Sequence, residues 1–160
     1  MTCIQYIVGD ATCPEGEGNK IIAHICNDAG GWGRGFVVAI SDNWAEPEQA
    51  FREWYRNRGE NGFDLGALQL VQVEDDLWVA NMIGQHGTRA PGGGGNPPIR
   101  YEAVETALTA LAAEAKQRQA SVHMPRIGCG LAGGRWDVIE TIIERTLCKD
   151  GIEVFVYDLE

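Results

Sequence analysis

Short apolar runs recur along this chain and predict six β-strands. They cover residues 4–8, 21–26, 67–73, 77–83, 121–124 and 154–157 and are rich in Ile, Val, Leu and aromatic residues. The run at 21–26 is almost unbroken in apolar residues, which is typical of a strand covered on both faces. The runs at 67–73 and 77–83 flank the acidic segment Glu74-Asp75-Asp76, so they are expected to pair through a turn.

Between these runs, apolar residues return every three or four positions, as on one face of a helix. Residues 36–40 indicate a short helix, and Pro47 suits the first turn of a second one. The spacing within 100–119 and 135–148 predicts two longer helices. Strands interleaved with helices favour an α/β domain whose mixed sheet is sandwiched by helices. We find no repeat or linker, so residues 1–160 are expected to form a single domain.

The composition is that of a globular protein. The hydrophobic fraction is 44% and the charged fraction 22%, as in ordinary globular proteins. No apolar run approaches the length of a membrane span, and the first residues lack the features of a secretory signal. We therefore expect a cytoplasmic protein without membrane contact.

The formal net charge is −10. General nucleic-acid binding is not expected, because that affinity comes from clustered Lys and Arg. A small anionic ligand remains possible, since backbone N–H groups can hold a phosphate inside an acidic protein.

The five cysteines (Cys3, Cys13, Cys26, Cys129 and Cys148) are an odd number and contain no C-x-x-C pair. This pattern favours reduced thiols over a disulfide framework or a metal site. Cys129 lies between two glycines. It is considered as a nucleophile, but its neighbours favour approach of the backbone rather than the thiol to a ligand.

Two glycine-rich segments each follow a predicted strand and precede a predicted helix. One holds four glycines within residues 128–134, and the other holds Gly30, Gly31, Gly33 and Gly35 after Asn27. Glycine permits close approach of the backbone, and a helix N-terminus offers free N–H groups to an anion. A tight turn that needs positive φ is the plainer interpretation of the loop at 128–134, and the G-x-G pattern of the other loop is weak evidence by itself. Together they predict a cradle for two phosphates at the carboxyl ends of the strands, although the Gly-Lys-Ser/Thr of a P-loop is absent.

Polar residues beside these loops are further candidates. Asp10 either accepts a hydrogen bond from an adenine amino group or caps the next turn. Tyr157 either stacks on a base or belongs to the rim of the core. Asn81, Gln85 and His86 are expected at the same edge of the sheet, where His86 either serves in acid–base chemistry or is structural.

Two further histidines, His24 and His123, lie within apolar strands and are expected to be hydrogen-bonded core residues.

These segments carry a family resemblance. Residues 9–12, 23–27, 31–36, 125–134 and 156–157 together resemble the macrodomain family. The string at 124–131, Met-Pro-Arg-Ile-Gly-Cys-Gly-Leu, is most similar to the branch that contains human terminal ADP-ribose protein glycohydrolase. The resemblance implies a three-layer α/β/α sandwich with a mixed, mostly parallel sheet that binds ADP-ribose.

The implied ligand site places Asp10 and Tyr157 at the adenine, the two glycine-rich loops at the diphosphate and Asn27 near the distal ribose. The full set of expected contacts is Gly9, Asp10, Ala11, Asn27, Gly31, Trp32, Gly33, Arg34, Gly35, Phe36, Asn81, Ile127, Gly128, Cys129, Gly130, Leu131, Ala132, Gly133, Gly134 and Tyr157.

The chain departs from that branch at two catalytic positions. Gln85 and Ala132 stand where the human enzyme has its lysine and aspartate, so the lysine-based mechanism is absent. Hydrolysis of ester-linked ADP-ribose from acidic side chains by water then depends on Asn27, Gln85 and His86. The alternatives are a non-catalytic ADP-ribose reader, an ADP-ribose 1″-phosphate phosphatase or an O-acetyl-ADP-ribose deacetylase.

The expected partners are ADP-ribose and ADP-ribosylated proteins or nucleic-acid ends. We expect a monomer without cofactor or metal. Residues 84–98 are expected to form a mobile loop, and its part at 92–98 is expected to gate the cleft.

Overall fold

The computed structural model describes residues 3–88, 97–130 and 132–159. Most of the loop predicted at 84–98 and the expected contact Leu131 therefore lie outside the described residues. The predicted start of that loop is wrong, because Gly84 and Gln85 belong to a strand. The helices and strands follow in the order β1 (Ile4–Val8), β2 (Lys20–Asn27), α1 (Phe36–Asn43), α2 (Glu46–Arg56), β3 (Leu68–Glu74), β4 (Leu77–Gln85), α3 (Tyr101–Arg118), β5 (Ser121–Met124), α4 (Trp136–Thr146), the 3₁₀ helix η1 (Cys148–Asp150) and β6 (Val154–Asp158).

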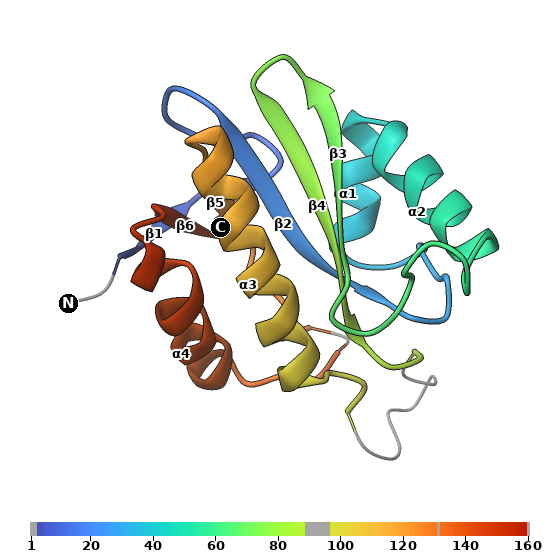
Figure 1. The fold of residues 1–160 in the computed structure, drawn as a ribbon. Helices are drawn as coiled ribbons and strands as arrows, with labels where there is room; N and C mark the ends of the chain where they lie inside the picture. The colour runs from blue at the N-terminus through green and yellow to red at the C-terminus, as the bar shows by residue number, and fades with distance from the viewer. Residues whose placement is uncertain (1–2, 89–96, 131, 160) are drawn as a thin grey trace.

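The strands form one sheet in the order β1-β6-β5-β2-β4-β3. Every neighbouring pair is parallel except β3 and β4, which are antiparallel. This sheet lies between two layers of helices (Figure 1). The predicted α/β fold with a mixed, mostly parallel sheet is confirmed.

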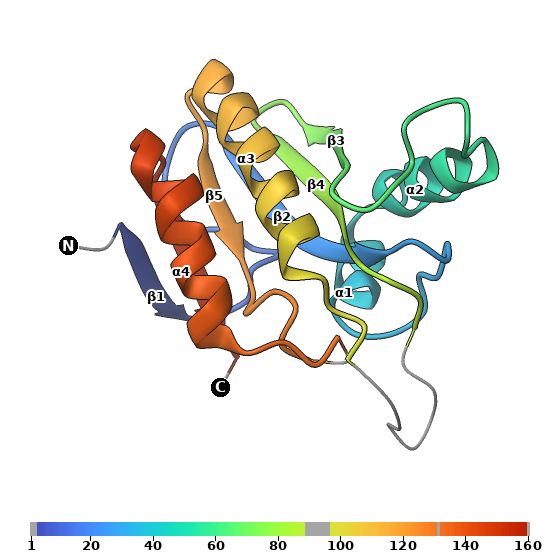
Figure 2. The same cartoon turned by 60° about the horizontal axis from the view of Figure 1, so that its bottom comes forward.

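Helices α3 and α4 cover one face of the sheet and α1 and α2 cover the other (Figures 1 and 2). Strand β2 shows why both faces are apolar. Ile21 and Ala23 belong to the core cluster that contains α3 and α4, whereas Ile22 and Cys26 belong to the cluster that contains α1 and α2. Alternate residues of a strand point to opposite faces, so a central strand between two helical layers needs an apolar run.

The predicted elements agree closely with the observed ones. The strands expected at 4–8 and 121–124 have the observed bounds, and the other elements differ by at most three residues at an end. Within the described residues, no helix combines the length and the apolar character needed to cross a membrane.

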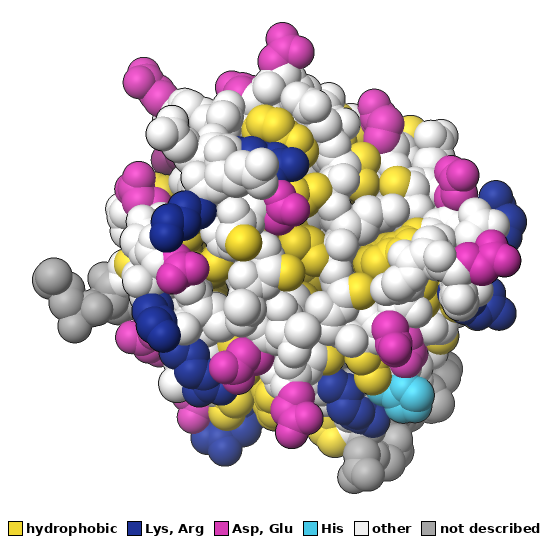
Figure 3. All heavy atoms as spheres, in the orientation of Figure 1, with side chains coloured by type: hydrophobic (Ala, Val, Ile, Leu, Met, Phe, Trp, Pro, Cys, Tyr) yellow, Lys and Arg dark blue, Asp and Glu magenta, His cyan; other side chains and the backbone are white. Residues whose placement is uncertain are grey.

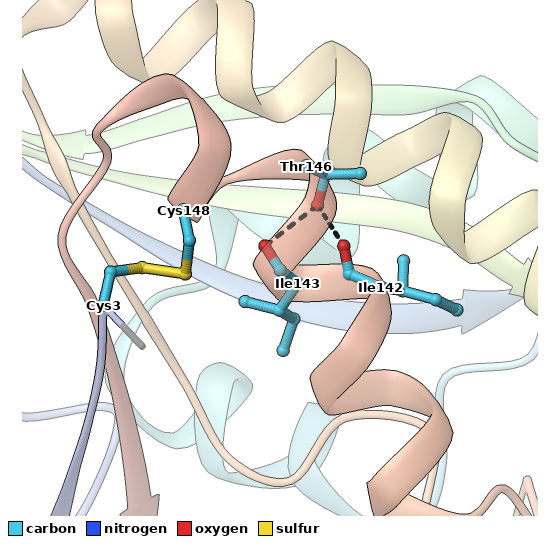
Figure 4. The surroundings of a disulfide bond; sticks show 5 residues. All are labelled: Cys3, Ile142, Ile143, Thr146 and Cys148. Atoms are coloured by element: carbon cyan, nitrogen blue, oxygen red, sulfur yellow. Dashed lines mark hydrogen bonds between the residues drawn. A yellow bond between two sulfur atoms is a disulfide. The ribbon is translucent and has the colours of Figure 1, made fainter. Parts of the chain in front are cut away.

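The cysteine prediction is wrong for one pair. Cys3 and Cys148 form a disulfide across a sequence separation of 145 residues, with their Cα atoms 5.4 Å apart. Figure 4 shows the bond between the start of β1 and the chain that follows α4. The two residues meet because β1 pairs with β6, which brings the beginning and the end of the chain together. Cys13, Cys26 and Cys129 are free thiols.

Candidate functional site

A cleft of about 590 Å³ lies where β2, β4 and β5 end. Because these strands are parallel, their carboxyl ends meet at one edge of the sheet, where α/β proteins bind ligands. The volume is in the usual range for a small-molecule site. The lining residues are His24, Ile25, Cys26, Asn27, Gly31, Trp32, Gly33, Arg34, Gly35, Phe36, Val37, Gln85, Thr88, Pro125, Arg126, Ile127, Gly128, Gly130 and Ala132.

The charged residues of this lining are basic, although the chain as a whole is acidic. Arg34 and Arg126 line the cleft, and no Asp or Glu does so among the described residues, although the chain carries a formal net charge of −10. On the face drawn in Figure 3, acidic and basic side chains are intermixed. The cleft is thus a local site suited to an anion within an acidic protein.

The loop between β2 and α1 is shaped by Asn27. Its Oδ1 accepts hydrogen bonds from the N–H groups of Ala29 and Gly31, both at 2.9 Å, and its Nδ2 donates to the Gly31 carbonyl at 3.1 Å. Asn27 therefore braces the turn and retains one amide hydrogen for a ligand.

The same loop leads into α1 with free donors. Gly35 precedes the helix at φ 80°, a conformation that favours glycine. Within the described part of the chain, the N–H groups of Gly33, Gly35 and Phe36 have no hydrogen-bond acceptor. They are the kind of donors that bind an anion at a helix N-terminus.

The loop between β5 and α4 is held by backbone hydrogen bonds, one within the loop and one from the segment before α3. The N–H of Gly134 donates to the Gly128 carbonyl at 2.7 Å, and the N–H of Ile99 donates to the Ala132 carbonyl at 3.1 Å. A Cβ added to Gly134 would lie 2.5 Å from the Gly128 oxygen, so the turn admits only glycine there. The N–H groups of Gly128 and Gly130 have no acceptor among the described residues.

Arg126 extends the cleft toward β6. Its Nε and Nη2 donate to the two carboxylate oxygens of Asp158 at 2.7 and 2.8 Å. These bonds hold the pKa of Asp158 below its ordinary value. The guanidinium also lies 5.1 Å from the ring centroid of Tyr6 and 5.3 Å from that of Trp136. Sequence reasoning did not single out Arg126 as a site residue, because only the fold brings Asp158 to its side.

Gln85 is the last residue of β4, and His86 follows it. Gln85 lines it and donates from Nε2 to the Gly87 carbonyl at 2.9 Å, which leaves its Oε1 free to accept. His86 lies outside the lining, and its Nδ1 is 2.7 Å from Asp28 Oδ2. Burial acts to raise the pKa of Asp28, but hydrogen bonds from Gly87 N–H and His86 outweigh it and lower that pKa.

Asn81 is placed in the core, and its expected position at the cleft is wrong. It lies in the middle of β4, fully buried, directly across from His24. Its Oδ1 accepts from His24 Nε2 at 2.5 Å, and its Nδ2 donates to Gln69 Oε1 and to the Pro47 carbonyl. The amide thus joins β2, β3 and α2.

His24 is the hydrogen-bonded core histidine that was predicted, and it also lines the cleft. Its desolvation lowers its pKa to about 4, and desolvation raises the pKa of the neighbouring Cys26 thiol. Both groups are neutral near pH 7.

Tyr157 does not face the cleft either. It is buried, and its hydroxyl accepts a hydrogen bond from the N–H of Glu15 and contacts His123 Nδ1 at 2.8 Å. His123 also contacts Ser121 Oγ at 2.8 Å, which agrees with its prediction as a core histidine. Tyr157 therefore occupies the rim of the core, the second of its two predicted roles.

Asp10 lies at the carboxyl end of β1, at the same edge of the sheet but outside the cleft lining. Its Oδ1 accepts from the N–H and the hydroxyl of Thr12, which is the capping role. The side chain is exposed, so adenine contact stays a prediction.

Of the other expected contacts, some line the cleft and some do not. Gly9, buried Ala11, Cys129, Gly133 and Gly134 are outside the lining, whereas the remaining described residues of the two loops line it. The described residues contain no group of His, Cys, Asp and Glu that could hold a metal ion.

Comparison with known proteins agrees with this geometry, although no family model matches the sequence. A macrodomain protein from Streptomyces coelicolor has 54% sequence identity and a TM-score of 0.86, over 97% of this chain and 98% of that one. Mouse chromodomain-helicase-DNA-binding protein 1-like is 34% identical over 98% of this chain, which spans only 18% of that protein. The structure of Thermosipho africanus DarTG in complex with ADP-ribose shares the fold at 18% identity, with a TM-score of 0.69 over 88% of this chain and 38% of that one. The chain belongs to the macrodomain family.

Proposed function

We propose that this protein binds ADP-ribose in the cleft and hydrolyses its ester bond to acidic side chains. The observation that carries the binding step is a lining with two arginines and no carboxylate in a chain of net charge −10. Two glycine-rich loops with free N–H groups face the same space, and a diphosphate needs such donors. DarTG from Thermosipho africanus, which shares the fold, has been solved in complex with ADP-ribose.

The two loops define how the ligand would lie. The N–H groups before α1 and those of Gly128 and Gly130 would surround the diphosphate, with Arg126 beside it. The distal ribose would then lie near Asn27 and Gln85. This arrangement supplies orientation and electrostatic stabilisation, which are the main contributions to catalysis when the leaving group is already a good one.

The Asp28–His86 pair supplies the base in this proposal. If Nδ1 donates to Asp28, as the 2.7 Å separation suits, the lone pair of Nε2 is available to a water molecule. When the water attacks the anomeric carbon, its proton passes to Nε2 and the carboxylate of the acceptor leaves. When it attacks the ester carbonyl instead, the ribose oxygen of ADP-ribose leaves and takes the proton back from Nε2. Gln85 Oε1 can accept a hydrogen bond from the same water. This mechanism needs no lysine.

One observation favours a second candidate, a non-catalytic reader of ADP-ribose. Besides the two arginines, the titratable residues in the described lining are His24 and Cys26, and both are neutral at pH 7. A pure reader would bind ADP-ribosylated protein tightly and release nothing.

Two measurements separate these functions. Calorimetric titration with ADP-ribose tests the binding step, and failure to bind would remove both candidates. Incubation with glutamate-ADP-ribosylated and serine-ADP-ribosylated peptides then tests the chemistry, since an ester hydrolase should release ADP-ribose from the first only. Binding without release from the glutamate ester would favour the reader.

A further inference from the structure

A second hollow lies on the other side of the turn that begins the cleft. It has a volume of about 340 Å³ and is lined by Gly30, Arg52, Tyr55, Arg56 and Arg58. We call it the arginine pocket. Gly30 lines the arginine pocket and Gly31 lines the cleft, so the same turn of backbone borders both hollows. Asn27, which braces that turn, lies where the distal ribose is expected.

The wall is rigid at this point. Gly30 has φ 80°, and a Cβ added to it would come within 2.5 Å of the Tyr55 ring. The ring therefore packs directly on the backbone of the turn, and only glycine allows this approach. What binds in the arginine pocket is thus held at a fixed place beside the cleft.

The three arginines of this pocket differ in how they are held. Arg52 donates from Nε to Glu48 Oε2 at 2.9 Å. Arg58 donates to the Tyr55 carbonyl at 2.9 Å and lies over the Tyr55 ring, 4.0 Å from its centroid. The side chain of Arg56 has no partner among the described residues and is exposed. Glu48 therefore pairs with one of the three arginines, and the pocket keeps an excess of positive charge.

A hydrogen-bond chain joins the arginine pocket to the cleft. Trp32, which lines the cleft, donates from Nε1 to Ser41 Oγ at 2.7 Å, and Ser41 donates to Glu48 Oε1 at 2.8 Å. Glu48 in turn orients Arg52. The position of Arg52 is therefore tied to that of a residue in the ligand site.

We propose that the arginine pocket receives acidic side chains of the ADP-ribosylated protein, next to its modified residue. The inference rests on the proposed function, because it assigns the acceptor side of the same substrate. Guanidinium groups bind carboxylates with paired, charge-assisted hydrogen bonds. A peptide that leaves the cleft near Asn27 crosses the Gly30 turn and meets this pocket next.

The structure favours a peptide over nucleic acid as the occupant. Arg58 already covers the Tyr55 ring, so the pocket offers no open aromatic face on which a base could stack. The net charge of −10 also opposes an extended polyanion, which gains affinity from many phosphate contacts at once. One or two carboxylates match the small basic area better.

The test compares two glutamate-ADP-ribosylated peptides that differ only in the residues beside the modified glutamate, acidic in one and glutamine in the other. We expect a KM about fivefold lower for the acidic peptide, the size of effect that exposed ion pairs produce. Arg56→Gln, which breaks no described contact, should reduce this preference, and R52Q/R56Q should abolish it. The matched controls K116Q and K116Q/K149Q remove the same charge at exposed positions elsewhere and should keep it.

Binding is measured in parallel with stable, oxime-linked analogues of both peptides, so that the result does not depend on hydrolysis. A preference that is lost in R52Q/R56Q, with unchanged affinity for free ADP-ribose, supports the pocket even if no ester is cleaved. If only the proposed hydrolysis is wrong, the protein will bind the glutamate-ADP-ribosylated peptides without releasing ADP-ribose. Equal affinity of the wild-type protein for both peptides overturns the proposal, and so does a preference that survives in R52Q/R56Q.

A third probe is an oligonucleotide that is ADP-ribosylated at its terminal phosphate. If R52Q/R56Q binds it more weakly while the peptides show no preference, the peptide proposal is overturned and the pocket is assigned to nucleic acid.

Discussion

His86 Nδ1 lies 2.7 Å from the Oδ2 atom of Asp28, although the two residues are 58 positions apart in the chain. Asp28 follows β2 and His86 follows β4, and these strands are parallel neighbours. The second oxygen of Asp28 accepts from the N–H of Gly87 at 2.7 Å, so the carboxylate is fixed and can orient the imidazole. The pair is the acid–base unit of the proposed hydrolase.

This arrangement predicts a defect in chemistry without a defect in binding. His86→Ala should lower the rate of ADP-ribose release from a glutamate ester on the order of a hundredfold. Asp28→Asn should lower it about tenfold, because the imidazole remains but loses its orientation. The affinity for free ADP-ribose should change less than about twofold in both. Asp76→Asn, in the turn between β3 and β4, is the control, and a His86→Ala protein that keeps wild-type release would exclude the pair from the reaction.

Arg126 offers a comparison between two similar ion pairs. Arg126 with Asp158 and Arg145 with Glu105 both show two hydrogen bonds between guanidinium and carboxylate, but only Arg126 lines the cleft. Arg126→Gln should weaken ADP-ribose binding about tenfold in calorimetry, because a charged donor is lost and Asp158 remains unpaired beside the ligand. Arg145→Gln should leave the affinity unchanged. Equal effects of the two substitutions would place the diphosphate away from Arg126.

Stability should fall on mild acidification because of two buried histidines. Desolvation lowers the pKa of His24 to about 4 and, with the charge of Lys20, lowers that of His123 to about 4. An unfolded chain protonates its histidines near pH 6.5, so between pH 6.5 and 4 the unfolded state binds more protons and gains stability over the folded one. The loss levels off below pH 4, where both states are protonated.

For His24 alone we expect the free energy of unfolding to drop by roughly 1–3 kcal/mol across this window. Urea unfolding at pH 7.5, 6, 5 and 4 measures the drop, and histidine ring signals in NMR identify its source. A His24 or His123 signal that titrates near pH 6.5 in the folded protein would contradict this explanation.

The disulfide between Cys3 and Cys148 closes nearly the whole chain. Cys3→Ser should lower the free energy of unfolding by about 2–4 kcal/mol, since cross-links of this kind restrict the unfolded chain. Reduction of the wild-type protein should have the same effect. Cys13→Ser, at an exposed free thiol, should change neither the stability nor the effect of reductant. Alkylation of the denatured, unreduced protein should modify three thiols; modification of all five would rule out the bond.

Much of the architecture follows from local patterns in the sequence. The apolar run of β2 predicts a strand covered on both faces, because each residue of a strand faces one of two layers wherever the strand lies in the sheet. The glycines at 30, 35 and 128 predict tight turns, and all three have positive φ. These properties depend on a few consecutive residues, so periodicity and glycine positions are sufficient to predict them.

The tertiary structure decided which side chains meet. Asn81 has a polar side chain of the kind that binds ligands, but its position opposite His24 buries it in the sheet. Arg126 meets Asp158 because β5 and β6 are neighbours, and Cys3 meets Cys148 because β1 and β6 are neighbours. The arginine pocket lies beside the turn at Gly30 because Tyr55 packs on that glycine. Such contacts depend on strand order and on the path of the chain between elements, and residues 25 to 145 positions apart carry no local signal of their pairing.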